Sequence, residues 1–240
     1  HAEVWYRIDQ PHDYVELFSA LNDRGVNFGL HFCGTTTSGH EANLGYPQGL
    51  DESIQLVKTC LDDAAKYHAI YVNIHSGNRC RFSLNLQNQT FTFDPKFPVI
   101  SDHISALTRN QALKHLGEYA QTRNIKLLVE PIPKKISTKS ASNYSDNNSL
   151  QHQYPAGLEG LLELCQSQLI GFTNDFCHLF AYYLDFDKFD STTNLMAPYT
   201  QICHINTLYL PYNGTDAHGG ILADDMKMPG VFPSTDKLIA

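Results

Sequence analysis

The chain has 240 residues, of which 42% are hydrophobic, so it can bury one large core. Its 25 acidic residues outnumber the 17 basic ones, and the formal net charge of −8 excludes an overall basic field that would attract nucleic acid. No apolar stretch approaches the roughly 18 residues of a membrane span, so we expect no contact with membranes. The six cysteines form no CxxC pair, and we interpret them as reduced thiols of a cytoplasmic protein.

Strand-like and helix-like segments alternate along the chain. Apolar runs rich in β-branched and aromatic residues predict strands at 3–9, 26–32, 69–75, 125–130, 169–175 and 201–207. Apolar residues at helical spacing predict helices at 13–22, from Asp51 onward, and at 101–122, 156–167 and 185–198. Asp51 is expected to cap the second of these helices.

Two segments interrupt this alternation. Residues 76–100 form a longer insertion that ends in a proline-rich stretch. Residues 134–155 are polar and of low complexity, too polar to pack, and we expect them to form a mobile loop over the rim of the fold.

Acids and histidines fall at the ends of the predicted strands. These residues are His31, His75, Glu130, Asp175 and His204. Only one common architecture brings the C-terminal ends of many successive strands together, the TIM (β/α)8-type barrel, whose active sites lie at that rim. We expect residues 1–240 to form a single such domain. Because six strands are visible instead of eight, a fragment lacking the first and last strands is predicted, with an open six-stranded sheet as the alternative.

Imidazoles and carboxylates brought to one rim have the chemistry of a divalent metal site. Glu130 follows an apolar run and would be costly to bury without a cation or a metal. The same argument applies more weakly to His204, which lies in a buried strand. His75 ends a buried strand, and its alternative is a hydrogen bond to a backbone carbonyl. His31 is the least defined member of the set. The other histidines, interpreted as solvated, are His12, His40, His68, His103, His115 and His152.

Two short motifs strengthen the metal hypothesis. Asp175 and His178 lie three residues apart at a strand end, above the same strand tip; the alternative is an N-cap aspartate with a surface histidine. Asp216 and His218 lie one residue apart beside two glycines and can chelate one ion. The alternative for this second pair is an ordinary polar loop.

Five motifs in this order resemble the xylose isomerase-like barrel superfamily, which includes sugar isomerases and epimerases and the endonuclease IV branch. The motifs are HSG at 75–77, VEP at 129–131, NDFCH at 174–178, CHIN at 203–206 and DAHGGI at 216–221. Each motif is short and only moderately specific, whereas their common order and spacing are informative. The resemblance extends over essentially the whole chain from its second strand.

The resemblance implies different ligand sets for the two branches. In the isomerase and epimerase branch, Glu130, Asp175 and His204 correspond to metal ligands, Glu130 also transfers a proton, and His178 lies near the substrate. A further glutamate is expected on a last strand beyond Ala240. In the endonuclease IV branch, counterparts of zinc-cluster ligands are His31, His75, Glu130, Asp175, His178, His204, Asp216 and His218.

Three functions remain open from the sequence. The first is an isomerase or epimerase of a small sugar or polyol that depends on Zn, Mn, Co or Mg, with Glu130 moving the proton. The second is a zinc-dependent phosphodiesterase acting at abasic DNA, for which Arg79 and Arg81 are the obvious basic pair at the rim and the candidates for binding substrate. The segment Gly34–Thr37, where the nuclease branch has a DNA-wedging loop, argues against this function. The third is a barrel retained as a non-enzymatic module.

Overall fold

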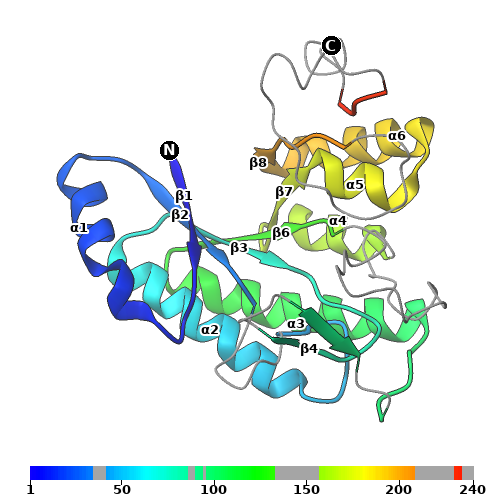
Figure 1. The fold of residues 1–240 in the computed structure, drawn as a ribbon, viewed down its shortest axis with the longest axis horizontal. Coiled ribbons are helices and arrows are strands. Elements are labelled where there is room, and N and C mark those ends of the chain that lie inside the picture. The colour runs from blue at the N-terminus through cyan, green and yellow to red at the C-terminus, as the bar shows by residue number, and fades with distance from the viewer. Residues whose placement is uncertain (35–41, 86–89, 94–95, 133–156, 209–229, 234–240) are drawn as a thin grey trace.

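A computed structural model of the chain describes residues 1–34, 42–85, 90–93, 96–132, 157–208 and 230–233. Within them, six parallel strands form one sheet in the order β1-β2-β3-β6-β7-β8, the order of the chain. The strands are β1 (Ala2–Tyr6), β2 (Phe28–Phe32), β3 (Tyr71–His75), β6 (Lys126–Glu130), β7 (Gly171–Asp175) and β8 (Thr200–His204). The six predicted strands are therefore confirmed, and together they form part of a TIM barrel (Figure 1).

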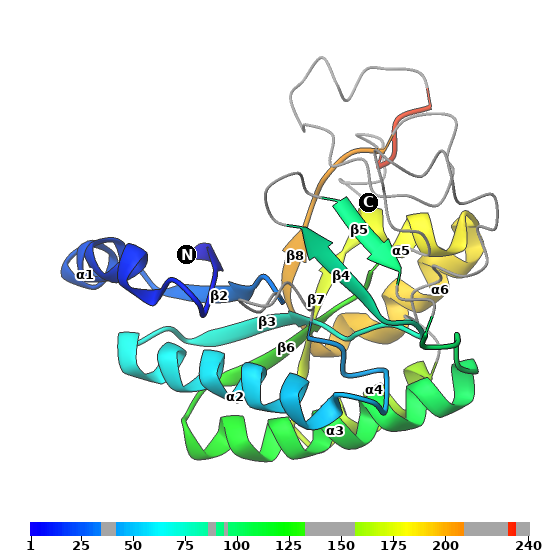
Figure 2. The same ribbon diagram turned by 60° about the horizontal axis from the view of Figure 1, so that its bottom comes forward.

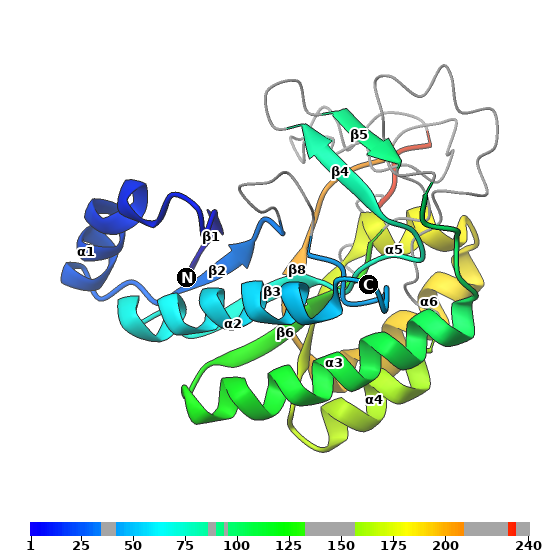
Figure 3. The ribbon, with the colours of Figure 1, turned by 90° about the horizontal axis from the view of Figure 1, so that it is seen from below.

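Helices connect successive strands of this sheet. They are α1 (Val15–Asp23), α2 (Leu50–Tyr67), α3 (Asp102–Thr122), α4 (Leu158–Gln166), α5 (Phe176–Tyr183) and α6 (Phe186–Met196), with short 3-10 turns at η1 (Pro11–Tyr14) and η3 (Ala197–Tyr199). The neighbouring helices α2, α3 and α4 lie side by side along one face of the sheet (Figures 2 and 3). This arrangement leaves the opposite face of the strands facing the inside of the partial barrel.

The predicted cap of α2 is wrong. The N-cap residue is Gly49, which adopts a left-handed φ of 79° and makes no side-chain cap hydrogen bond. Asp51 lies one residue into the first turn, where its carboxylate faces the positive end of the helix dipole. Val57 and Leu61 are buried, as the helical spacing predicts.

Helix α5 was not predicted. Its sequence, FCHLFAYY, has no polar face, so it lacks the periodicity by which an amphipathic helix is recognised. Five of its residues are buried, which explains why most of the sequence is apolar: Cys177, His178, Leu179, Phe180 and Ala181.

The insertion after β3 contains an antiparallel hairpin, β4 (Phe82–Asn85) and β5 (Thr90–Phe93). In Figure 2 this hairpin stands above the carboxyl end of the sheet. The predicted mobile loop at 134–155 lies outside the described residues.

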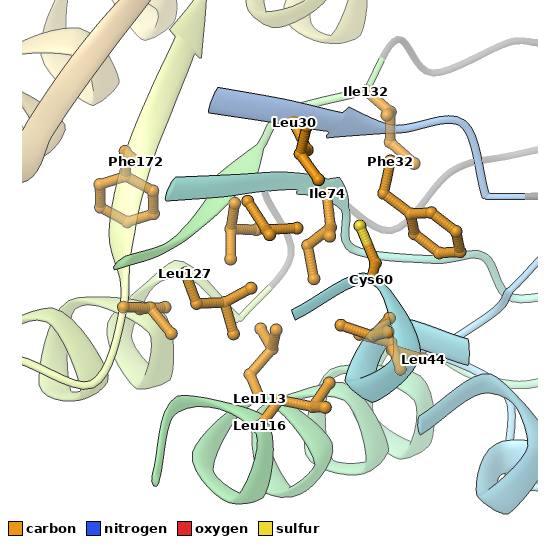
Figure 4. Close-up of a cluster of buried hydrophobic side chains, with 14 of the residues drawn as sticks. Leu30, Phe32, Leu44, Cys60, Ile74, Leu113, Leu116, Leu127, Ile132 and Phe172 are labelled. Atoms are coloured by element: carbon orange, nitrogen blue, oxygen red, sulfur yellow. The ribbon is translucent and has the colours of Figure 1, made fainter. Parts of the chain in front are cut away.

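The main core fills the space between the sheet and its helices. Figure 4 shows Leu30, Ile74, Leu127 and Phe172 from the strands packed toward Leu113 and Leu116 of α3 and Cys60 of α2. Full burial of each such aliphatic side chain contributes about 1.5–3 kcal/mol to folding. Because side chains alternate across a strand, the neighbours of these core residues point to the inside of the partial barrel.

In the portion of the chain that the structure describes, no helix is long and apolar enough to cross a bilayer.

Candidate metal centre

The strand ends place five predicted residues at one rim. His75, Glu130, Asp175 and His204 are the last residues of β3, β6, β7 and β8, and His31 is the residue before the end of β2. The sheet register pairs His75 with Glu130 and Asp175 with His204. The predicted convergence of these distant residues is therefore present in the structure.

Glu130 lies at the centre of this group and is 1% exposed. Its Oε1 lies 3.2 Å from Nδ1 of His178 and 3.2 Å from Nδ1 of His204. Its Oε2 lies 3.6 Å from Nε2 of His31 and 3.7 Å from Nε2 of His75. One buried carboxylate thus faces four imidazoles from four different elements.

Burial and close contacts shift the pKa values of the groups in the centre in different directions. Burial raises the pKa of Glu130, but the contacts with His178 and His204, together with the nearby ring of His75, outweigh it and hold the pKa well below its usual value. Burial raises the pKa of Asp175, and the nearby charge of His178 offsets this only in part. Burial lowers the pKa of His204, but its bonds to Glu130 and Glu3 outweigh this and raise the pKa to about 10. Carboxylates held this way favour a positive charge among them.

Asp175 and His178 combine the two alternatives that the sequence left open. The side chain of Asp175 caps α5, because its Oδ1 accepts the backbone N–H of His178 at 2.8 Å. His178 is nevertheless a buried residue, 4% exposed, and its Nδ1 lies 2.9 Å from the carbonyl oxygen of Pro131. Since a carbonyl only accepts, Nδ1 of His178 carries the hydrogen, and Nε2 has the lone pair in the neutral ring.

The donor groups fit a divalent metal. Three sets of three residues bring their ligand atoms within 4.8 Å of one another: Glu130, Asp175 and His204; His31, His75 and Glu130; Glu3, His31 and His204. Imidazole nitrogens and carboxylate oxygens suit Zn²⁺, Mn²⁺ and Co²⁺. Among the described residues, the buried Nε2 atoms of His31 and His75 have no hydrogen-bond partner, an arrangement that is costly without a cation.

The remaining predicted residues lie elsewhere. Asp216 and His218 are outside the described residues. The Nε of Arg79 donates to the carbonyl of Ile100 at 2.8 Å and lies 3.3 Å from Asp102. The guanidinium of Arg81 lies over the ring of Phe97, 4.7 Å from its centroid. Both arginines follow β3 and contact protein groups, and their substrate role stays a prediction.

Two polar residues of the centre were missed by the sequence analysis. The Nδ2 of Asn73 donates to Oε2 of Glu130 at 2.6 Å, and its position two residues before His75 on one strand face was an available signal. Glu3 on β1 lies 2.9 Å from both His31 and His204. Since β1 and β8 are opposite edges of the sheet, the contact with His204 shows that the two edges curl toward each other.

Solved structures share this fold at low sequence identity. D-psicose 3-epimerase with D-tagatose, from Clostridium cellulolyticum H10, is 11% identical, with 88% of this chain and 65% of that chain covered and a TM-score of 0.55. The TTHB071 protein of Thermus thermophilus, soaked with ZnCl2, is 19% identical, with 85% and 67% covered and a TM-score of 0.53. A xylose isomerase-like TIM barrel protein from Mycobacterium smegmatis in complex with magnesium is 13% identical, with 85% and 60% covered and a TM-score of 0.51.

Of two further comparisons, one finds no match and the other shows the family. No curated protein matches the chain significantly. The chain spans 65% of the length of the psicose epimerase, slightly less than two thirds. The family model described as xylose isomerase-like TIM barrel matches residues 6–230, nearly the entire chain. The chain therefore belongs to the xylose isomerase-like TIM barrel family.

Proposed function

We propose that this chain carries the active site of a divalent-metal-dependent isomerase or epimerase of a small sugar or related polyol. The observation that carries the proposal is the convergence of Glu130, Asp175 and His204 within 4.8 Å at the carboxyl end of the sheet. Active sites of β/α barrels lie at this end. The shared fold of proteins named as sugar epimerases agrees with the proposal.

Glu130, Asp175 and His204 would hold the metal. When bound, the ion would polarise a carbonyl and a hydroxyl oxygen on adjacent carbons of the substrate and so lower the cost of removing the proton between them. We assign the removal of that proton to Glu130, because it is the ionised carboxylate at the centre of the group.

His178 is suited to orient a substrate hydroxyl. Its ring is buried beside Glu130, and Pro131 fixes its tautomer through Nδ1. A lone pair at Nε2 can accept a hydrogen bond from a hydroxyl group. The side chain of Asn206 donates to Oδ2 of Asp175 at 3.1 Å and holds that carboxylate in place.

A zinc-dependent phosphodiesterase is the second candidate. The group of His31, His75 and Glu130 favours it, because Glu130 would then be shared between neighbouring metal ions. Clustered metals can activate water and stabilise a leaving oxygen. The net charge of −8 and the pairing of Arg79 with Asp102 argue against an acidic polymer as substrate, which places this function second.

Metal stoichiometry and a substrate panel test the two functions together. One Mn, Co or Mg per chain, with interconversion of aldoses and ketoses or of ketose epimers, is the expected result. Two or three Zn per chain with cleavage of an abasic oligonucleotide would replace the first function by the second. Metal binding without turnover on either panel would contradict both.

A further inference from the structure

Glu3 connects two histidines of the candidate metal centre through a single oxygen. Its Oε1 lies 2.9 Å from Nδ1 of His31 on β2 and 2.9 Å from Nε2 of His204 on β8. The two imidazole rings are nearly parallel, with centroids 5.6 Å apart and an interplanar angle of 12°. Glu3 therefore contacts different nitrogens, Nδ1 of His31 and Nε2 of His204, on two rings that come from distant parts of the chain.

The other nitrogen of each ring faces Glu130. Nε2 of His31 lies 3.6 Å from Oε2 of Glu130, and Nδ1 of His204 lies 3.2 Å from Oε1. Each imidazole thus stands between an outer carboxylate, Glu3, and an inner one, Glu130. The inner carboxylate is 1% exposed at its side chain, and the outer one is 19% exposed.

Hydrogen-bond chemistry assigns the protons of these rings. A neutral imidazole has one N–H and one lone pair, an ionised carboxylate only accepts, and a metal needs the lone pair. A ring nitrogen that contacts Glu3 therefore carries the hydrogen. Glu130 is also an ionised carboxylate, so in the metal-free protein His204 donates to both carboxylates. When a metal lies beside Glu130, the ring nitrogens that face Glu130 give up their hydrogens and supply the lone pairs, and the nitrogens that contact Glu3 keep theirs.

We propose that Glu3 is a positioning residue that holds His31 as the Nδ1–H tautomer and His204 as the Nε2–H tautomer. The two histidines then bind metal through different atoms, His31 through Nε2 and His204 through Nδ1. Carboxylates that fix metal-binding histidines in this way are a general feature of metal sites. The metal in this inference rests on the proposed function.

Direct coordination by Glu3 is the competing arrangement. A metal bound to Glu3 would need the lone pairs of Nδ1 of His31 and Nε2 of His204. A metal bound to Glu130 needs the lone pair of the other nitrogen of each ring. One neutral ring cannot give its lone pair to both sides. Glu130 is more buried than Glu3, and His75 and Asp175 beside it are further candidate ligands. The side of the rings that faces Glu130 therefore offers a metal more donor atoms.

The surroundings hold both His31 and Glu3 in place. Trp5 packs on the ring of His31 with centroids 4.4 Å apart. Gly29 pairs with Glu3 in the sheet, and the ring of Tyr71 fills the space that a Cβ at Gly29 would need. Asn73 also approaches Nδ1 of His31, at 3.4 Å, but the contact with Glu3 is shorter and charged and so decides the tautomer.

The first test is the tautomer of each ring in the zinc-loaded full chain. NMR spectra that correlate ring nitrogens with ring protons in ¹⁵N-histidine-labelled protein distinguish N–H from metal-bound nitrogen. We expect metal at Nε2 of His31 and at Nδ1 of His204. Metal at Nδ1 of His31 or at Nε2 of His204 would overturn the proposal.

The second test measures zinc affinity by competition with a chelator. Glu3→Leu should weaken zinc binding by about 10–100-fold, the usual effect of losing such a partner, and Glu3→Gln, which keeps an acceptor oxygen, should weaken it less. Glu16→Gln, an exposed residue on α1, makes the same change of charge and should leave affinity unchanged. Unchanged affinity and tautomers in Glu3→Leu would overturn the proposal.

The two tests separate this inference from the proposed function. Neither uses a sugar or a nucleic acid, so failure of every substrate panel would contradict the function and leave the ring tautomers measurable. If the Glu3 variants do not fold, the tautomers of the unmodified chain decide the question alone.

Discussion

The amino and carboxyl ends of the parallel sheet carry different kinds of side chains. The amino end contains a hollow of about 1080 Å³, lined by residues from β6, β7 and β8 and from the segments before β3, β6, β7 and β8. Polar side chains there form ordinary surface contacts, such as Lys126 with Gln201 at 3.0 Å. The carboxyl end has buried carboxylates and histidines with strongly shifted pKa values.

This difference shows that charge and burial identify the candidate site better than volume does. Shifted pKa values cluster at functional sites, and β/α barrels place their chemistry at the carboxyl end. The hollow at the amino end is open and contains no comparable group of carboxylates and histidines among its lining residues. We therefore assign the chemistry to the rim that carries Glu130.

The largest expected effect is that of Glu130→Gln. Because two groups of candidate ligands share this carboxylate, the variant should lose bound metal, and turnover should fall by at least about 10²-fold, the lower range for a lost general base. Metal content by elemental analysis and the circular dichroism spectrum measure the effect and the fold. Full metal content in a folded variant would contradict the central position of Glu130.

Metal removal should have the next largest effect. An ion that binds only the folded state stabilises it by about 2.7 kcal/mol at a free concentration 100 times its Kd. Chelation should therefore lower the midpoint of thermal unfolding, and addition of Zn²⁺ or Mn²⁺ should restore it. Equal midpoints with and without chelator would show that the carboxyl end holds no ion.

The metal-free protein should show a stability maximum between about pH 4.5 and 6.5. Burial raises the pKa of Glu3, but bonds to His204 and His31 outweigh it and lower the pKa from 4.5 to about 2, so this stabilisation is lost as pH falls. The pKa of His204 is raised from 6.5 to about 10, so its stabilisation is lost as pH rises through this range.

Urea unfolding of chelated protein at several pH values measures this dependence. His204→Phe should remove the alkaline loss of stability while the acidic loss remains in part through Glu130. A free energy of unfolding that increases between pH 7 and pH 10 in the unmodified chain would contradict the pairing of His204 with Glu3 and Glu130.

The smallest effect is expected at the amino end. Lys126→Met removes an exposed contact with Gln201 and should change stability by less than about 0.5 kcal/mol. Metal content and turnover should not change. If Lys126→Met abolished turnover, the assignment of the active site to the carboxyl end of the sheet would be wrong.

The sequence predicts the rim because its residues end apolar runs, and strand ends meet in a parallel sheet. His31, His75, Glu130, Asp175 and His204 were found in this way. Their exact metal roles were implied only by the family resemblance, and they remain a proposal.

The features that were missed depend on tertiary structure. Glu3 lies on an edge strand, and its contact with His204 depends on how far the sheet curls, which no local pattern encodes. Helix α5 is buried and has no polar face to reveal its period. The predicted start of α2 is wrong because Gly49 begins the helix through its backbone conformation, which a search for a capping side chain such as that of Asp51 does not detect.

A crystal of the protein grown with Zn²⁺, with diffraction recorded at the zinc absorption edge, tests the central claim most directly. We predict an anomalous peak at the carboxyl end of the sheet, about 2.0–2.2 Å from ligand atoms of Glu130, Asp175 and His204. A map with no peak among these three residues would contradict the account.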